Sequence, residues 1–277
     1  MTDCAMRLRA TVCSVAAALT VSTTPHARAA SVLTVPGPET PTISSAMARA
    51  GEGDTVIVED GVYKESVLLG PGIVLKAASL FKAVVDGGGK GVGVTLANNS
   101  AVMGLEIRNS TIGIFSSSVG NTIATCRIVN NTQSGVMCVG HLPAIHDNII
   151  AYNKGSGIQG WDVRSTKSSI NHNTIAYNGN HGIAVGGNSN IIVENSIIAF
   201  NEQFGIKLEP EVSRVNLVGN DFYGNTSFSR TLPANNIAKD PLFIDPQRMN
   251  FGLKKKSPCI GRGADRRDLG ARLPELE

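Results

Sequence analysis

The side chains best suited to binding or catalysis are grouped with the single Trp of the chain. They combine an indole, a carboxamide, carboxylates and cationic groups, and they are Gln159, Trp161, Asp162, Arg164, Lys167, Lys207 and Glu209. An indole can stack on a sugar ring, while guanidinium and ammonium groups pair with the carboxylate of a uronic acid. The set therefore predicts a site for an acidic polysaccharide, in which Trp161, Gln159 and Lys167 bind the substrate.

The charged members of this set suit two kinds of reaction. A uronate lyase or epimerase has to neutralise the substrate carboxylate and remove the C5 proton, and Lys207 or Arg164 could be that base. Asp162 and Glu209 would then be partners of Ca²⁺ or of other charged groups. A glycoside hydrolase would instead use Asp162 and Glu209 as its two carboxyls. Two coils would separate them by about 9.6 Å, near the upper limit of the inverting range. All four residues are candidate catalytic residues.

A repeat of 22 to 25 residues has to position these side chains. Asn recurs at nearly the same phase, and a Gly followed by an aliphatic residue comes four residues after each of the first five. The Asn positions are Asn109, Asn131, Asn153, Asn178, Asn201 and Asn225. Fixed periods of this length are typical of stacked, one-dimensional architectures. The turns lie too close together for crossover helices, so the chain is predicted to wind on itself as a coil of parallel strands.

Alternation along the strand after each Gly predicts an inward column and two outward columns. The inward column is Ile114, Val136, Ile158, Ile183 and Ile206. The outward columns are Phe115, Met137, Gln159, Ala184 and Lys207, and then Ser117, Val139, Trp161, Gly186 and Glu209. Because Ala184 and Gly186 are small, we expect a shallow trough on this face, with Trp161 on it. The Trp161 coil is also the longest, and insertions in solenoids often form binding loops.

Other positions of the repeat predict internal stacks. Like residues lie over like at about 4.8 Å in such a coil. Ile150, Ile175 and Ile198 would form an interior aliphatic column, and Tyr152, Tyr177 and Phe200 an aromatic stack. The Asn column would pass amide hydrogen bonds from coil to coil and adopt the left-handed turn conformation. Most of the regular sequence is thus assigned to structure.

The two ends of the chain differ from the repeat. Residues 1–29 combine a basic stretch, a short apolar stretch and an Ala-Arg-Ala cleavage site, which predicts a secretory signal peptide and a secreted or periplasmic protein. Residues 30–53 are expected to form an N-terminal cap with a short helix at Thr42–Ala50. Coils are expected over residues 54–230, followed by a loop-rich closing segment, 231–277, over the last coil.

The charge of the mature chain is close to neutral. The whole chain has a net charge of +3, but residues 1–29 hold three Arg and one Asp, so +1 remains after their removal. This charge does not indicate a nucleic-acid partner. No later stretch reaches the about 18 apolar residues of a membrane-spanning helix. Capped ends favour a monomer.

The repeat resembles that of secreted bacterial right-handed parallel β-helix proteins of the pectin-lyase-like superfamily. The Asn-x-Ile-x-x-Asn-x-x-x-Gly-Ile pattern is similar to their repeat, Gly53–Val58 to their first coil, and Asp240–Ala271 to their closing segment. The resemblance covers essentially the whole mature chain. It implies an all-β, single-stranded right-handed parallel β-helix (solenoid) with a short N-terminal capping helix and a loop-rich C-terminal closing segment.

For function, the resemblance implies a protein that acts on or binds a polysaccharide. The superfamily includes lyases, hydrolases, epimerases and proteins without catalysis. The motif sets of pectate lyases and polygalacturonases are missing, and Gly157–Asp162 keeps only the aromatic residue and the Asp of the epimerase motif. We therefore expect an exported polyuronide lyase or epimerase first and a glycoside hydrolase second, with Ca²⁺ as the candidate ion and no transition-metal site. A noncatalytic carbohydrate-binding or envelope-surface structural module is the alternative.

Overall fold

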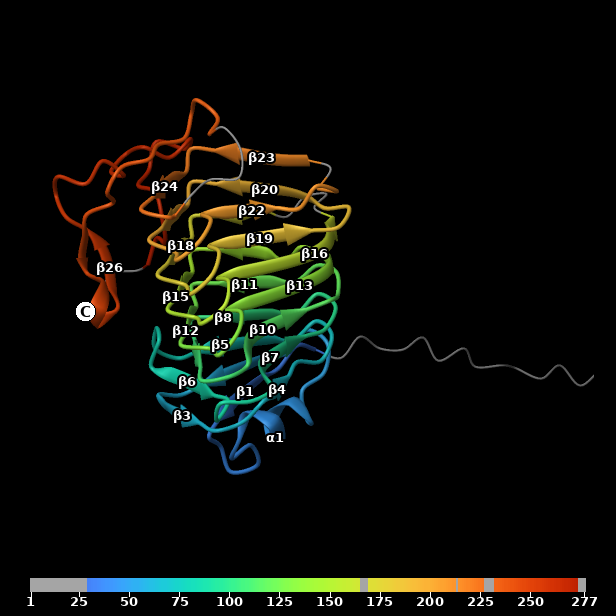
Figure 1. The fold of residues 1–277 in the computed structure, drawn as a ribbon. Helices are drawn as coiled ribbons and strands as arrows, with labels where there is room; N and C mark the ends of the chain where they lie inside the picture. The colour runs from blue at the N-terminus through green and yellow to red at the C-terminus, as the bar shows by residue number, and fades with distance from the viewer. Residues whose placement is uncertain (1–28, 165–168, 213, 227–231, 274–277) are drawn as a thin grey trace, which may run out of the picture.

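Three columns of short parallel strands build almost the whole molecule (Figure 1). The computed structural model describes residues 29–164, 169–212, 214–226 and 232–273. Within them, each coil contributes one strand to each column, and the strand pairs in parallel with its counterpart one coil away. This arrangement confirms the predicted all-β parallel β-helix. Lys167 and nearly all of the predicted signal peptide fall outside the described residues.

The strands of each column follow one another at intervals of one coil. The first column holds β4 (Val67–Leu68), β7 (Val92–Leu96), β10 (Ile112–Ser116), β13 (Val136–His141), β16 (Ile158–Arg164), β19 (Ile183–Gly186) and β22 (Ile206–Leu208). The second holds β1 (Val32–Val35), β2 (Thr55–Val58), β5 (Val74–Ala77), β8 (Ala101–Met103), β11 (Thr122–Ala124), β14 (Ala144–His146), β17 (Ile170–Asn171), β20 (Asn190–Glu194) and β23 (Arg214–Val218). The third holds β3 (Gly61–Tyr63), β6 (Ala83–Asp86), β9 (Glu106–Arg108), β12 (Arg127–Val129), β15 (Ile149–Ala151), β18 (Thr174–Ala176), β21 (Ile197–Ala199) and β24 (Asp221–Tyr223).

Aliphatic side chains fill the interior of the coil in register. The predicted inward column is paired residue to residue from Ile114 to Ile206, and each of its members is at most 1% exposed. Ile150, Ile175 and Ile198 also pair in register and are fully buried. Burial of an aliphatic side chain of this size contributes about 1.5–3 kcal/mol. Stacking of like residues therefore makes a continuous core along the coil.

The Asn column is present, but it begins one member later than predicted. Amide Nδ2–H to Oδ1 hydrogen bonds of 2.9–3.0 Å link Asn131, Asn153, Asn178, Asn201 and Asn225 in turn. The prediction for Asn109 was wrong: Ser110 holds the column position, and its N–H donates to Asn131 Oδ1 at 3.0 Å. Arg108 pairs with Val129, 21 residues later, so this coil is one residue shorter here than the 22-residue spacing assumed. Asn109 instead bonds Asp86 on the surface.

The left-handed conformation belongs to the residue before each column Asn. Asn130, Tyr152, Tyr177 and Phe200 have φ between 55° and 58°, whereas the prediction gave this conformation to the column Asn itself. The bend before the Asn directs its amide into the interior and turns the preceding side chain outward. Tyr177 consequently stacks on Tyr152 at 5.2 Å and 11° between planes, and on Phe200 at 5.0 Å and 12°. The predicted aromatic stack is confirmed.

The C-terminal segment does not lie over the last coil as predicted. Only its start does so, where Asn236 Oδ1 accepts hydrogen bonds from Asn220. The rest, including the antiparallel hairpin β25 (Phe243–Asp245) and β26 (Asn250–Leu253) with the 3-10 turn η1 (Pro246–Arg248), runs back beside the third column (Figure 1). The reason is a second apolar cluster on the outer face of the third column: Phe81, Val129, Ile149, Ala151, Ala176, Ile197, Ala199, Phe243, Phe251, Cys259 and Leu269.

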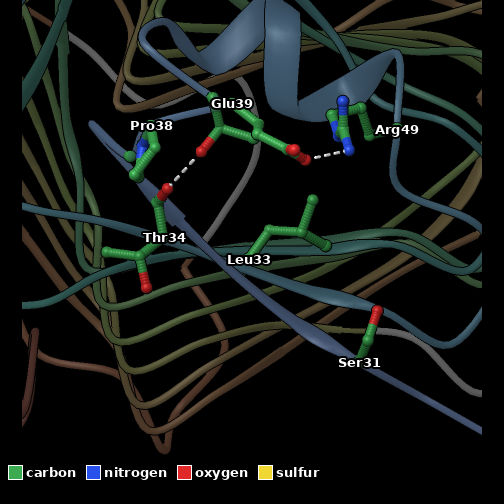
Figure 2. A pocket seen from close by; sticks show the side chains of 8 residues that line it. Ser31, Leu33, Thr34, Pro38, Glu39 and Arg49 are labelled. Carbon is green, nitrogen blue, oxygen red and sulfur yellow. Dashed lines mark hydrogen bonds and ion pairs between the residues drawn. The ribbon is translucent and has the colours of Figure 1, made fainter.

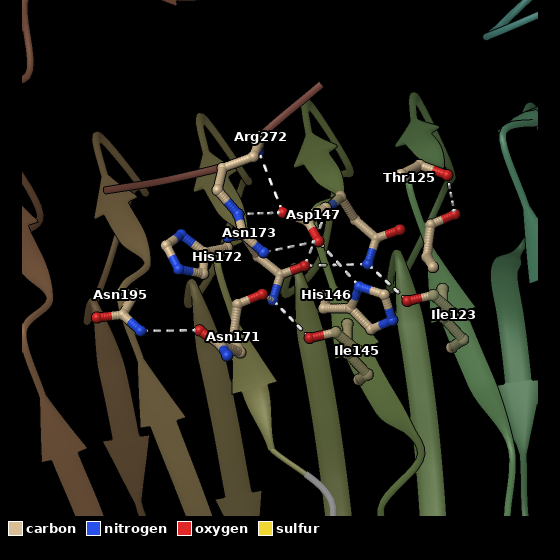
Figure 3. Close-up of polar contacts among 12 residues, drawn as sticks. Ile123, Thr125, Ile145, His146, Asp147, Asn171, His172, Asn173, Asn195 and Arg272 are labelled. Atoms are coloured by element: carbon tan, nitrogen blue, oxygen red, sulfur yellow. Dashed lines mark hydrogen bonds and ion pairs between the residues drawn. The ribbon is translucent and has the colours of Figure 1, made fainter. Parts of the chain in front are cut away.

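Polar contacts tie the end of the C-terminal segment to the corner between the second and third columns (Figure 3). Arg272 Nε donates to Asp147 Oδ1 at 2.9 Å, and His146 Nδ1 lies 2.9 Å from the same carboxylate. One coil further, His172 Nε2 lies 2.9 Å from Asp265 Oδ2. The segment is thus held along the coil by both apolar packing and ion pairs.

A short helix closes the N-terminal end, as predicted, although it is shorter than Thr42–Ala50. Helix α1 (Ile43–Met47) begins at the N-cap Thr42, and its Ile43 and Ala46 are buried in the core. The Glu65 carboxylate accepts hydrogen bonds from the first two backbone N–H groups of the helix, where negative charge is favourable. Among the described residues, no helix has the length and apolar character needed to cross a membrane.

Candidate functional site

A groove of about 490 Å³ lies on the outer face of the first column and its adjoining corner. Outward residues of neighbouring strands are in register there, with Gln159 beside Ala184 and Ala184 beside Lys207. The small Ala184 leaves the floor low between two polar side chains, so the expected trough is present at this position, whereas at Gly186 the Trp161 ring covers the backbone instead. We call it the Lys207 groove, and it is lined by Thr132, Gln133, Ser134, Lys154, Gly155, Ser156, Gln159, Asn180, His181, Ala184, Lys207 and Glu209.

Charge and aromatic contacts fix Lys207 within the groove. Its Nζ lies 4.0 Å from Glu209 Oε1 and 5.3 Å from the centre of the Phe204 ring. Both side chains of the ion pair are partly exposed, at 34% and 43%, so water screens their attraction. At the other side of the groove, Ser134 Oγ donates to Gln159 Oε1 at 3.0 Å, which leaves the Gln159 amide N–H groups to face a ligand.

His181 belongs to this groove, although its residue type and spacing did not place it in the predicted site. The Phe204 backbone N–H donates to His181 Nδ1 at 3.3 Å, and the two rings lie 5.5 Å apart. Burial, followed by the nearby Lys207 ammonium, holds the pKa of His181 below its usual range, against a smaller opposing effect of Glu209. The imidazole is therefore neutral, and its proton is on Nε2 because Nδ1 accepts. In this state His181 offers the Nε2–H as a hydrogen-bond donor to a ligand.

The repeat register does contain a signal for His181. The residues immediately before the repeated Gly positions stack on one another, because each Gly N–H donates to the carbonyl of that residue one coil later. These residues are Ser134, Ser156, His181 and Phe204. Ser134, Ser156 and His181 line the groove, so alignment of the residue before each repeated Gly would have identified this column from the sequence.

Three of the predicted site residues lie away from the groove. Trp161 is 52% exposed, and its ring packs over the backbone of Gly186, where a Cβ would come within 2.3 Å of the indole. Asp162 has φ of 52°, and its Oδ1 accepts the Asn188 N–H at 2.8 Å. Arg164 ends β16 and pairs with Asn190, which joins the first and second columns. Gln159, Lys207 and Glu209 therefore come together without Trp161, Asp162 and Arg164.

The groove does not offer the ligands that Ca²⁺ requires. Calcium takes six to eight oxygen ligands, mostly carboxylates and carbonyls. Among the described residues that line the groove, Glu209 is the one carboxylate, and Lys154 and Lys207 add positive charge. No group of three or more His, Cys, Asp or Glu side chains within the described part of the chain is arranged to hold a metal ion. These residues do not fit a bound calcium ion.

A second, larger hollow lies at the N-terminal end, between β1 and the helix (Figure 2). Its volume is about 840 Å³. Its two charged side chains, Glu39 and Arg49, form an ion pair with each other, and Thr40 Oγ1 donates to the Thr34 carbonyl at 2.6 Å. Because these polar groups satisfy one another, the hollow offers less to a charged ligand than the Lys207 groove.

Comparison with known proteins agrees with the architecture. An alginate lyase from Paenibacillus sp. str. FPU-7 superposes with a TM-score of 0.51 at 18% identity, over 71% of this chain and 77% of that one. The pectate lyase Pel9A superposes with a TM-score of 0.52 at 14% identity, over 88% of this chain and 96% of its own. At these identities the similarity concerns the fold. No curated protein sequence matches the chain. Residues 91–232 match the model of the right handed beta helix region, and the chain belongs to that family.

Proposed function

We propose that this protein is exported and acts on an acidic polysaccharide, which it binds in the Lys207 groove. The observation that carries the proposal is the convergence of Lys154, Lys207 and the neutral His181 on one concave surface. Ammonium groups pair with carboxylates, and the Nε2–H of His181 adds a directed donor. The mixed polar side chains Gln159 and Asn180 suit sugar hydroxyls. The names of the solved structures that share the fold, a pectate lyase and an alginate lyase, support the same class of substrate.

The chemistry that fits this groove best is proton removal next to a uronate carboxylate, as in a polyuronide lyase or epimerase. Lys207 is the base that takes the proton from C5 of the uronate, while Lys154 and His181 hold the carboxylate on which negative charge develops. In a lyase, the C5–H electron pair forms the C4–C5 double bond, the C4–O bond breaks, and the departing oxygen takes up a proton. In an epimerase, a proton returns to C5 from the opposite face.

A glycoside hydrolase has less support from the groove. Hydrolysis uses two carboxyl groups on either side of the glycosidic bond. Glu209 faces the groove, whereas the Asp162 carboxylate is bonded to the backbone N–H of Asn188 outside its lining. No second carboxylate lines the described part of the groove, so the two-carboxyl reaction lacks a partner for Glu209.

The test is turnover of defined polyuronides. Pectate, alginate and chondroitin are incubated with the protein, and unsaturated uronate product is followed by its absorbance, with NMR of the polymer to detect epimerisation. We expect Lys207→Ala to abolish product, while Lys90→Ala, an equal loss of charge on an exposed lysine that does not line the groove, leaves it unchanged. Full activity in Lys207→Ala would refute the catalytic assignment.

A noncatalytic carbohydrate-binding module is the second candidate. It is favoured by the ion pair between Lys207 and Glu209 and by the donor state of His181, because both groups are then engaged before a ligand arrives. Calorimetric titration with oligouronates separates the two functions. Binding that weakens in Lys207→Ala, with no product from any substrate, would establish the module and exclude the lyase or epimerase.

A further inference from the structure

The C-terminal segment has a charge quite different from that of the coils. Residues 232–273 contain nine Lys or Arg and four Asp residues, an excess of five positive charges. The whole chain has a net charge of only +3, so the remainder of the protein is slightly negative. Positive charge is therefore concentrated on the one segment that packs outside the coil.

The carboxylates of this segment are engaged in local contacts and do not neutralise the cations. Asp265 bonds His172 at 2.9 Å, and Asp268 Oδ1 accepts the Gly261 N–H at 2.8 Å. Asp240 Oδ1 accepts the Leu242 N–H at 2.9 Å. Asp245 accepts the Arg248 N–H at 3.3 Å and lies 3.7 Å from its guanidinium. The acidic residues thus cap turns, and most of the cationic side chains face water.

Six exposed cations lie on two successive turns that are held by backbone hydrogen bonds and by buried neighbouring residues. They are Lys254, Lys255, Lys256, Arg262, Arg266 and Arg267, and none of them has an ion pair among the described residues. Ser257 N–H closes the first turn on the Lys254 carbonyl at 2.8 Å, and Arg266 N–H closes the second on Gly263 at 2.8 Å. Leu269 N–H donates to the Cys259 carbonyl at 3.0 Å, and both residues are buried in the second apolar cluster. We call these six residues the basic face.

We infer that the basic face is a second binding surface for an acidic polysaccharide, separate from the Lys207 groove. It sits on the segment that covers the third column, whereas the groove is on the first column (Figure 1). Guanidinium and ammonium groups pair with the carboxylates of a polyuronide, and the hydrogen-bonded turns hold the backbone of these cations in place before the ligand arrives. The inference rests on the proposed class of substrate but does not depend on turnover.

The composition of the basic face argues against other polyanions. Single-stranded nucleic acids bound without sequence preference are held by aromatic side chains that stack on bases, and residues 254–268 contain no aromatic residue. A membrane surface is bound by cations together with apolar side chains that enter the lipid. The one large apolar side chain exposed here is Ile260, at 42%. A flexible polycarboxylate needs neither feature.

The test is retention on immobilised polygalacturonate as salt is raised, with affinity measured by calorimetry. Two variants each replace the three cations of one turn by uncharged glutamine: K254Q/K255Q/K256Q and R262Q/R266Q/R267Q. We expect each to weaken binding about tenfold and to lower the salt needed for elution, since each exposed pair contributes about twofold to fivefold. The matched control K64Q/K76Q/K90Q loses the same charge from exposed lysines of the N-terminal coils and should change affinity less than twofold.

Three outcomes decide the inference. Equal loss in the control variant would show that net charge alone is responsible, and unchanged affinity in both basic-face variants would exclude the surface; either result overturns it. Stronger retention on DNA than on polygalacturonate would also overturn the assignment of the ligand. Lys207→Ala separates the two proposals, because it should abolish turnover and still leave a column retention that depends on the basic face. All variants alter exposed side chains, and calorimetric unfolding checks that each is folded.

Discussion

Substitution of Asn178 by Ala tests how much the Asn column contributes to stability. The side chain is completely buried and makes four hydrogen bonds. Its Oδ1 accepts from the backbone N–H and the amide of Asn153 at 3.2 and 3.0 Å. Its Nδ2 donates to the Ile150 carbonyl at 3.1 Å and to Asn201 Oδ1 at 2.9 Å. Alanine would leave two buried N–H donors of Asn153 without an acceptor.

The expected loss follows from those two donors. A buried polar group without a partner costs about 1–3 kcal/mol, so Asn178→Ala should lower the free energy of unfolding by about 2–6 kcal/mol. For a chain of this size, each kcal/mol corresponds to about 2–4 °C in Tm. The middle of this range corresponds to a decrease in Tm of roughly 8–16 °C. Differential scanning calorimetry measures it, with denaturant unfolding as the second method.

Asn109→Gly is the matched control for this experiment. Asn109 is exposed, its side chain bonds only the Asp86 carboxylate among the described contacts, and its φ of 52° is one that Gly adopts without strain. We expect a loss below about 1 kcal/mol. If Asn178→Ala costs no more than Asn109→Gly, the side-chain hydrogen bonds do not stabilise the coil, and the reasoning about the column is refuted.

Three further variants test the packing and the electrostatics. Burial raises the pKa of Asp221 to about 6 from 3.8. The contribution of its protonated carboxyl to the free energy of unfolding is therefore complete below pH 4 and is lost as pH rises through 6. Asp221→Asn should therefore remove a decrease of about 3 kcal/mol between pH 4 and pH 8 in denaturant unfolding; an unchanged pH profile contradicts this. Gly157→Ala should cost about 1–3 kcal/mol, because its Cβ would lie 2.7 Å from the Gly182 carbonyl; an unchanged Tm contradicts the close approach. Arg272→Ala removes the ion pair with Asp147 and should speed hydrogen exchange of the C-terminal segment alone; equally fast exchange in the coils would contradict a local attachment.

The sequence predicts the coil well because one physical rule governs every turn. Parallel stacking places each residue over its counterpart, so a period of 22 to 25 residues specifies the inward column and the aromatic stack together. The error at Asn109 arose because Asn was aligned with Asn at a spacing of 22 residues. The third-column strands of these two coils are paired at a spacing of 21 residues. Asn on the surface and Asn in the column look alike in sequence. Only the strand register distinguishes them.

The candidate site was harder to predict because local chain geometry interrupts the alternation. Asp162 was placed beside Trp161 on the binding face, but its positive φ redirects the side chain to cap the turn at Asn188. The insertion of the longest coil lengthens β16 and joins it to β20, so it does not build the groove. His181 was passed over because a lone corner His matches no catalytic or metal-binding motif, and only the repeat register aligns it with the column that borders the groove. Its role depends on Phe204, which lies one coil away.

The position of the C-terminal segment explains why the outer face of the third column is not available to a long ligand. Outward positions of the third column change from Glu106 and Arg108 in one coil to Ile149 and Ala151 two coils later, and the apolar ones are buried by the returning segment. A polymer cannot lie along that covered surface. The outward residues of the first column over the later coils include the polar Gln159 and Lys207, on either side of Ala184. Coverage of the third column thus follows from the change in its own outward residues, and it leaves the Lys207 groove of the first column open to solvent.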